Sequence, residues 1–272
     1  MTAQPPLTDP TALAQHRARA TERGMFLQET ALDEVKDRLE VVNKSFTAPA
    51  IVTGFPQVWA GLLSPAKLVA DGETLDFTPQ AHDLVVHAMG LHWANDPIGQ
   101  LIQCRRALRP DGLLQAVAFG GQTLHELRAC LGQAEAEITG GMSPRIAPMA
   151  ELRDLGGLLQ RAGLALPVAD SLPLRVEYAD AWALMRDLRA MGETNALEGR
   201  LRRPTARSVL NRAAELYSAH FTAPSGRITA TFDLIFLTGW APDDSQPKPL
   251  RPGSAQQRLA DALNSREEPL PD

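Results

Sequence analysis

The chain has 272 residues, 44% apolar and 22% charged, which is the composition of a globular protein large enough to bury a substantial core. Its net charge of -5 gives no electrostatic reason to expect nucleic acid or an anionic membrane surface as a partner. No apolar run approaches the roughly 18 residues of a membrane span, and the N-terminus lacks a signal-peptide pattern. Cys104 and Cys130 form neither a zinc-site spacing nor a disulfide framework, so the expected location is cytoplasmic.

The first predicted helix covers residues 31–42, where apolar side chains recur at helical spacing. It leads into AIVTG, a short strand at 50–54 that ends at Gly54 and is followed by Phe55 and Pro56. A turn that cradles a nucleotide cofactor needs several glycines, so that backbone N–H groups approach the ligand closely, and proline has no N–H to donate. Gly54 is therefore either the remnant of a cofactor loop or a simple strand-ending turn, and a single glycine favours the turn.

The next stretches predict strands of a parallel sheet. AKLVADGETLDF, residues 66–77, contains a brief strand with a turn at Asp71. DLVVHAMGLHW, residues 83–93, is an unbroken apolar run, typical of a parallel strand covered on both faces. A helix capped at Asp96 follows, and then the strand LLQAVAF at 113–119. Strand, helix and strand in this order indicate a right-handed crossover and an α/β core.

The second half of the chain changes character, because four helical patterns follow before the last strand. They cover residues 124–138, 152–162, 180–191 and 205–220. RITATFDLIFLTGW, ending at residue 240, is rich in β-branched and aromatic residues and predicts a strand. Together with a strand near Leu174 it would close the sheet as an antiparallel edge, and the helices would cap one end.

Two sets of tracts resemble known families. DLVVHAMGLHWANDPIGQLIQCRRALRPDGLLQAVAFGG resembles the fourth strand, following helix and fifth strand of class I S-adenosylmethionine-dependent methyltransferases. FGGQTLHELRACLGQAEAEITGGMSPRIAPMAELRDLGGLLQRAGL, with DLRAMGETNA and LTGWAPDDSQPKPLRPGSA, resembles the mitochondrial complex I assembly factor 5 family and its bacterial relatives. That group is methyltransferase-like, and its animal member is linked to arginine hydroxylation on a complex I subunit. The resemblance implies a Rossmann-like class I methyltransferase fold with a mostly parallel sheet, an antiparallel C-terminal edge and a helical cap.

The N-terminal half departs from that family's pattern. Only 28 residues separate Gly54 from Asp83, too few for two complete strand–helix units. One unit is therefore predicted to be missing, and the second strand, whose carboxylate would hold the cofactor ribose, is the expected loss. An alternative alignment makes Asp71 that carboxylate. The predicted strands are 51–54, 66–70, 83–89 and 113–119.

S-adenosylmethionine is the cofactor that the resemblance implies, and weak or absent binding is expected because the loop is degenerate. The candidate cofactor-binding residues are Gly54, Asp71, Met89, His92 and Trp93. His92 and Trp93 follow a predicted strand at its carboxyl end, where ligands bind in open α/β sheets. They would line a pocket there, or Trp93 would plug the end of the sheet while His92 bonds to the backbone.

Several histidines raise the question of an iron site, given the link to hydroxylation. A facial triad needs two histidines and a carboxylate that converge. Strand spacing puts His87 in the middle of a buried strand, so convergence with His92, His82, His125 or Glu126 is not expected. No metal is predicted.

Polar side chains cluster in the tract that follows the strand at 113–119. They would form a substrate or partner pocket over the sheet edge, in which the two glutamates could pair with an arginine side chain, or an exposed helix face and a surface loop. The candidate pocket residues are Phe119, Gly120, Gly121, Thr123, Glu126, Arg128, Glu135, Ser143 and Arg145.

Three functions follow as hypotheses. The preferred one is a methyltransferase-fold protein, of the complex I assembly type, that modifies or recognises a protein side chain, an arginine, with impaired or lost cofactor binding. The alternatives are an active methyltransferase or arginine hydroxylase, and a binding module for another small ligand. The expected partner is a protein substrate or a respiratory complex I subunit. The expected domains are an arm at 1–24, a methyltransferase-like domain at 25–240 with cap segments at 121–165 and 180–222, and a tail at 241–272.

Overall fold

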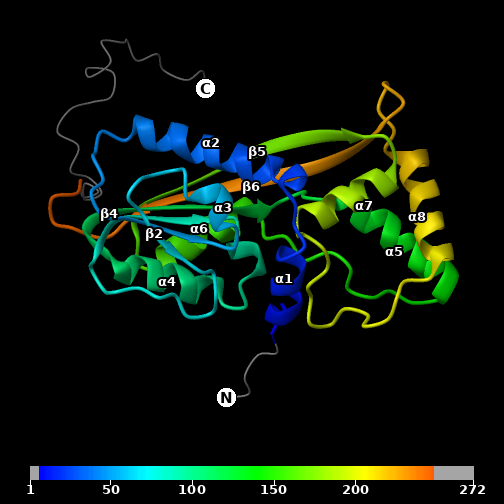
Figure 1. Ribbon diagram of the computed structural model, residues 1–272, viewed down its shortest axis with the longest axis horizontal. Coiled ribbons are helices and arrows are strands. Elements are labelled where there is room, and N and C mark those ends of the chain that lie inside the picture. Colours follow the sequence, from blue (N-terminus) through cyan, green and yellow to red (C-terminus); the bar gives the residue numbers. More distant parts are fainter. Residues whose placement is uncertain (1–5, 248–272) are drawn as a thin grey trace, which may run out of the picture. The chain divides into compact units, whose positions relative to one another are not determined.

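The computed structural model describes residues 6–247, which form a mixed α/β fold around one six-stranded sheet. The strand order is β2-β1-β3-β4-β6-β5 (Figure 1). The strands are β1 (Pro49–Thr53), β2 (Lys67–Val69), β3 (His82–Ala88), β4 (Leu108–Gly120), β5 (Ala165–Tyr178) and β6 (Ile228–Trp240). The first four run parallel, and β6 pairs antiparallel with both β4 and β5. The predicted fold class, including the antiparallel C-terminal edge, is confirmed.

The helices cover both faces of the sheet, as the two-sided burial of the central strands requires. The helical elements are α1 (Pro10–Arg17), η1 (Glu22–Gly24), α2 (Phe26–Val41), α3 (Pro56–Trp59), η2 (Leu91–Trp93), α4 (Pro97–Ala107), α5 (His125–Thr139), α6 (Leu152–Arg161), α7 (Ala181–Ala190) and α8 (Arg207–His220). One apolar core joins Val85 with α4 and α6, and the other joins Val86 with α2, α5, α7 and α8. Successive residues of a strand thus pack into the cores on opposite faces of the sheet.

The cap helices α5, α7 and α8 lie beside the C-terminal end of β5 and the N-terminal end of β6 (Figure 1). Asp180 caps α7 by accepting a hydrogen bond from the backbone N–H of Ala183, at the start of the helix predicted over residues 180–191. The cap therefore lies on the same side as the carboxyl end of β4, which continues through Gly120 into α5. No helix within residues 6–247 is long and apolar enough to cross a membrane.

The passage between Gly54 and His82 holds one short strand, as its length predicted. The identity of the missing unit was predicted wrongly, because β2 pairs directly with β1, with Ile51 opposite Leu68. In the doubly wound strand order, that neighbour of the first strand is the second strand of the fold. The missing position is the third, and Asp71 follows the strand whose end carries the ribose-binding carboxylate in related folds.

Residues 6–24, which the sequence assigned to an arm, contain a helix that packs against the rest of the fold. Ala12 and Leu13 of α1 are buried with Trp93 and Leu197. Backbone hydrogen bonds from Asp9 and Thr21 reach the segment that follows α7 and the end of α7 itself. The C-terminal part of the expected tail, residues 248–272, lies outside the described residues.

The short helix α3 is fixed to α2 by one buried hydrogen bond, from the indole Nε1 of Trp59 to Oε1 of Gln28 at 2.8 Å. Trp59→Phe should lower the free energy of unfolding by about 1 to 3 kcal/mol, because it leaves the Gln28 oxygen buried without a donor. Urea denaturation measures the change. The double variant Gln28→Leu with Trp59→Phe should recover part of it, and an equal or larger loss in the double variant would contradict this account.

Candidate functional site

A buried ion pair lies at the carboxyl ends of β1 and β2. Nη1 of Arg17, the last residue of α1, donates to both carboxylate oxygens of Asp71 at 2.7 Å. The two side chains are only 10% and 11% exposed. The guanidinium also lies 5.6 Å from the ring of Phe55 and crosses the strand-ending turn, since a Cβ built on Gly54 would meet Nη1 of Arg17 at 2.4 Å. Arg17 therefore fills the space above the one glycine of this turn.

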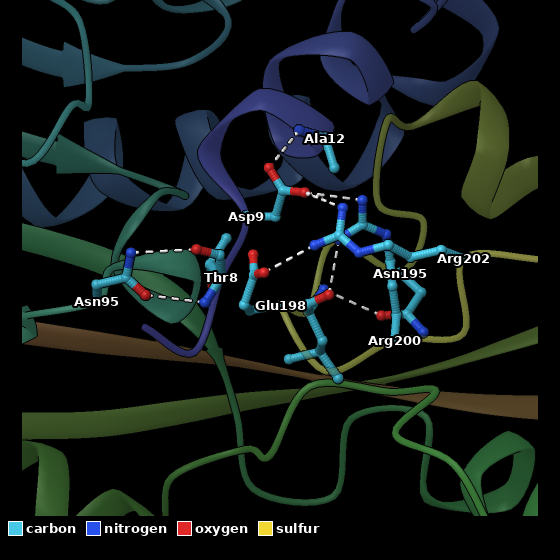
Figure 2. A network of polar contacts seen from close by, with 9 residues as sticks. Thr8, Asp9, Ala12, Asn95, Asn195, Glu198, Arg200 and Arg202 are labelled. Atoms are coloured by element: carbon cyan, nitrogen blue, oxygen red, sulfur yellow. Dashed lines mark hydrogen bonds and ion pairs between the residues drawn. The ribbon is translucent and has the colours of Figure 1, made fainter. Parts of the chain in front are cut away.

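The segment before Arg17 is tied to the body of the fold by the polar contacts that Figure 2 shows. Asp9 caps α1 by accepting a hydrogen bond from the N–H of Ala12 and forms an ion pair with Arg200 at 2.8 Å. Thr8 and Asn95 exchange two hydrogen bonds, N–H to Oδ1 at 2.8 Å and Nδ2 to the carbonyl oxygen at 3.2 Å. These contacts fix the N-terminal end of α1, and the helix carries Arg17 to its other end.

The residues at this edge do not fit S-adenosylmethionine as they are arranged here. Both oxygens of the Asp71 carboxylate, which would hold ribose hydroxyls, accept from Arg17. The N–H of Phe55 donates to Oγ1 of Thr53 at 3.0 Å, and Pro56 has no N–H to offer. A cleft of about 540 Å³ lies alongside, lined by residues of α1, β1 and β2. Space for a ligand exists there, but the groups that would recognise a nucleoside are engaged.

A second cavity, of about 170 Å³, lies under the helical cap. Aromatic side chains from η2, β4 and β6 form one wall, and leucine and methionine side chains of α5 and α7 form another. The lining residues are His92, Trp93, Phe119, Thr123, Leu124, Leu127, Leu131, Arg145, Ile146, Ala147, Met149, Met185, Leu188, Met191, Glu193, Thr194, Asn195 and Phe232. An apolar cavity of about 150 Å³ admits a benzene-sized group, so this one has room for one side chain and not for a nucleoside.

The ionisable centre of this cavity is Glu193, which directly follows the glycine that ends α7. Its Oε2 accepts from Nε1 of Trp93 at 2.7 Å and lies 3.3 Å from Nε2 of His92, while its Oε1 is buried without a hydrogen-bond partner among residues 6–247. Burial raises the pKa of Glu193, but His92, the charge of Arg17 and the Trp93 donor outweigh burial and hold that pKa below its ordinary value. The carboxylate is therefore charged at neutral pH.

Glu193 is not among the sequence-predicted site residues, although the tract DLRAMGETNA contains it. Its partners Trp93 and His92 lie 100 and 101 residues away in the chain, so no local spacing reveals the contact. The available signal was a lone carboxylate placed directly after a helix-ending glycine, within a tract that carries the family resemblance.

The structure brings together some of the sequence-predicted site residues and separates others. His92, Trp93, Phe119, Thr123 and Arg145 all line the cap cavity. The hydroxyl of Thr123 is engaged locally, because it donates to the Gly120 carbonyl oxygen at 2.7 Å and accepts from the N–H of Asp233 at 2.9 Å.

The remaining candidates lie outside the lining of the cap cavity. Met89 is packed in the core, and a Cβ on Gly120 would meet a side-chain carbon of Ile235 at 2.6 Å, so this glycine permits the close approach of β6. Gly121 has a φ of +53° and faces Asp233. Arg128 donates to the carbonyl oxygen of Ala147 at 3.2 Å.

Both glutamates of the predicted pocket are committed to contacts within the fold. Glu126, 3% exposed, accepts from the hydroxyl of Thr231 at 2.6 Å. Glu135 accepts from Nε and Nη2 of Arg145 at 2.9 and 2.6 Å and from the hydroxyl and N–H of Ser143. Glu135 thus holds the loop after α5, and Glu126 ties α5 to β6.

The histidines considered for an iron site do not converge. His82 contacts the Ala48 carbonyl oxygen, and His87 is fully buried against Gln100. His125 is 3.4 Å from Glu126, and His92 contacts Glu193. Within residues 6–247, no group of three or more His, Cys, Asp or Glu side chains is placed to hold a metal ion.

Comparison with known proteins identifies the family. Residues 12–116 match the family model described as a methyltransferase domain. The arginine-hydroxylase NDUFAF5, mitochondrial, of Mus musculus is 36% identical over 243 residues, which cover 89% of this chain and 65% of that protein. Its counterpart in Danio rerio is 39% identical over 198 residues, 72% of this chain and 61% of that protein. The chain belongs to the NDUFAF5 family of methyltransferase-domain proteins. The resemblance drawn from the quoted tracts is confirmed.

Relatives also include proteins named for methyl transfer. The malonyl-[acyl-carrier protein] O-methyltransferase of Laribacter hongkongensis is 35% identical over 179 residues, 66% of this chain and 58% of that protein. Among solved structures, a putative methyltransferase from Bacillus halodurans aligns with a TM-score of 0.49 and 13% identity, over 78% of this chain and 99% of that chain. The chain spans less than two thirds of the length of these three curated relatives.

The comparisons overturn one expectation. The sequence predicted a cytoplasmic location from its two unpaired cysteines and its N-terminal composition, and this prediction is wrong, because the NDUFAF5 relatives are named mitochondrial. Neither feature separates a cytoplasmic protein from one of another reducing compartment.

The Glu135–Arg145 pair generates a pH-dependent prediction. Its hydrogen bonds, above all those from Arg145, lower the pKa of Glu135 from 4.5 to about 2, although burial opposes this. A carboxyl whose pKa is lower in the folded than in the unfolded chain stabilises the fold at pH values above its unfolded-state pKa. This contribution is lost as the pH falls from about 5 to about 2. Glu135→Gln should lower the free energy of unfolding by about 3 kcal/mol at pH 7. The difference in free energy of unfolding between the variant and the unsubstituted protein should become smaller as the pH falls over that range.

The measurement is urea denaturation at several pH values. Glu137→Gln is the matched control, since Glu137 pairs with Arg212 on the surface and both side chains are 39% exposed. An exposed pair contributes little. A loss at Glu135 no larger than at Glu137, or one independent of pH, would show that the ion pair does not stabilise the loop.

Proposed function

We propose that this chain is a methyltransferase-fold protein that recognises a protein side chain, an arginine, and that its binding of S-adenosylmethionine is weakened or lost. The relatives' name, arginine-hydroxylase, supports the choice of arginine. The proposed partner is a subunit of respiratory complex I, in keeping with the resemblance to the complex I assembly factor 5 family. The proposed organisation is the sequence-based one, a methyltransferase-like domain at 25–240 flanked by an N-terminal segment and a tail.

The observation that carries this proposal is the position of Arg17. In the open α/β sheet, the edge where β1 and β2 end is the place for a nucleotide cofactor. Arg17 covers the Gly54 turn there and neutralises Asp71 within a pair that is about nine-tenths buried. Breaking a buried pair by removing one partner costs about 3 to 5 kcal/mol, so a ligand that must separate Arg17 from Asp71 binds less tightly by a comparable amount.

The cap cavity supports the second half of the proposal. Its lining includes half-buried side chains of the cap, Ile146, Met149 and Met185, together with the charged carboxylate of Glu193. A pocket for a single side chain beside the sheet edge suits recognition of a protein substrate better than recognition of a free nucleotide.

A second candidate function is that of an active S-adenosylmethionine-dependent enzyme. The specific observation in its favour is that β2 pairs directly with β1, as the second strand of the fold does, which supports Asp71 as a ribose-binding carboxylate. The adjoining cleft of about 540 Å³ would then admit the cofactor once Arg17 withdraws.

A titration separates the two candidates. Isothermal titration of S-adenosylmethionine and S-adenosylhomocysteine into the unsubstituted protein should give binding weaker than micromolar, because Arg17 holds both oxygens of Asp71. Arg17→Ala should bind at least about tenfold more tightly, since it frees the carboxylate and uncovers Gly54; tenfold corresponds to about 1.4 kcal/mol.

The control is Arg19→Ala, which removes an exposed arginine two residues away. Micromolar or tighter binding by the unsubstituted protein would overturn the proposed loss of cofactor binding and favour the enzyme. Equal, weak binding by all three proteins would mean that Arg17 is not what excludes the cofactor.

Assembly of complex I in cells supplies an independent test. Asp71→Asn keeps the size of the side chain and one acceptor for Arg17 but removes the charge. If recognition without the cofactor is the function, cells that rely on this variant should assemble complex I at near-normal levels, measured by native gel electrophoresis. Loss of assembly by a variant of normal thermal stability would point to the enzyme instead.

A further inference from the structure

The unused acceptor in the cap cavity is Oε1 of Glu193. The side chain is 8% exposed, and this oxygen has no hydrogen-bond partner in the part of the chain that the structure describes, whereas Oε2 is held by Trp93 and His92. Leaving a buried charged acceptor unpaired is costly, so such an atom in a native fold calls for a ligand, a water or a functional role. Trp93 and His92 fix the orientation of the carboxylate and leave one oxygen available.

The surroundings of Glu193 select the chemistry of the missing partner. The carboxylate is ionised, and an ionised acceptor in an apolar site pairs best with a cationic donor. The charge of Arg17 acts on Glu193 but is shared with Asp71, to which Nη1 donates. Nε and Nη2 of Arg17 are buried without a hydrogen-bond partner among the described residues, and none of its nitrogens donates to Oε1. The cavity therefore carries a negative charge that is incompletely matched within the fold.

The walls of the cavity favour the guanidinium of arginine over the ammonium of lysine. Trp93, Phe119 and Phe232 bring aromatic rings to the cavity, together with the imidazole of His92. A guanidinium is planar and weakly hydrated and stacks on aromatic faces, whereas an ammonium is compact and strongly hydrated. The leucine and methionine side chains of α5 and α7 suit the methylene stem of a long side chain.

We propose that Glu193 is the specificity-determining residue of the cap cavity and that its Oε1 accepts a hydrogen bond from the guanidinium of an arginine side chain of a partner protein. Trp93 and His92 act as positioning residues, because they hold Oε2 and through it the orientation of the carboxylate. This inference rests on the proposed recognition of a protein side chain. It adds the carboxylate of Glu193 as the group that binds the positive charge of that side chain.

The test uses two probes of nearly the same shape with the full chain, Nα-acetyl-L-arginine methylamide and its citrulline analogue, in which an uncharged ureido group replaces the guanidinium. Binding is followed by the ¹⁵N–¹H signal of the Trp93 indole, which donates to Glu193 and is assigned from its absence in Trp93→Phe. The arginine probe should shift this signal saturably at millimolar concentrations or below, and the citrulline probe should bind at least about tenfold more weakly. Glu193→Gln should lower the affinity for the arginine probe by at least about tenfold, which is about 1.4 kcal/mol.

The matched control is Glu198→Gln, since Glu198 lies in the same loop but pairs with Arg202 at the surface, 43% exposed. Equal binding of the two probes, unchanged arginine binding by folded Glu193→Gln, or no saturable shift would each overturn the proposal. If Glu193→Gln fails to fold, the comparison of probes on the unsubstituted protein still decides. Failure here would leave the cofactor titration and the assembly test of Asp71→Asn unaffected, so the two proposals fail separately.

Discussion

The pairing of Arg17 with Asp71 connects the N-terminal helix to the functional edge of the sheet. An ion pair only about a tenth exposed is stabilising only if its geometry is good, because both charges give up hydration. Here Nη1 alone reaches both carboxylate oxygens, while Nε and Nη2 are buried without a hydrogen-bond partner among the described residues. The ring of Phe55 lies beside the guanidinium, and the absence of a Cβ at Gly54 leaves room for it. A glycine that serves a cofactor in other nucleotide-binding folds accommodates a side chain of the protein itself in this one.

The same helix links this edge to the cap cavity. The segment that follows α7 hydrogen-bonds to α1 through the carbonyl oxygen of Ala196 and carries Glu193 three residues earlier. Gly192 lies against the backbone of Arg17, and the charge of Arg17 lowers the pKa of Glu193. A displacement of α1 would therefore affect both the nucleotide edge and the carboxylate of the cavity, which gives the two sites a physical connection through one packed helix.

Many polar residues of the second half hold the cap in place. Glu126 bonds to β6, and Glu135 with Arg145 and Ser143 fixes the loop that closes one side of the cavity. Polar side chains set among apolar ones in a helix look alike in sequence, whether they bind a ligand or satisfy buried backbone and hydroxyl groups. Arg145 donates to Glu135 and to the hydroxyl of Thr205, and it also lines the cavity. Its role therefore follows from its contacts and not from its residue type.

The sequence by itself determined most of the elements after residue 24, the α/β class and the family, because apolar periodicity and helix caps report local burial and the long tracts around residues 119–164 are distinctive. It did not determine α1, which it assigned to an arm. It also determined that one strand unit is missing, since chain length limits what fits between Gly54 and His82. Only the tertiary structure decided which unit is missing, because the pairing of β2 with β1 is a contact between strands and not a property of either. The same holds for Arg17 with Asp71, 54 residues apart, and for Glu193 with Trp93, 100 residues apart. A sequence pattern shows which side chains are buried, but the partners of a buried charge are set by the packing of distant elements.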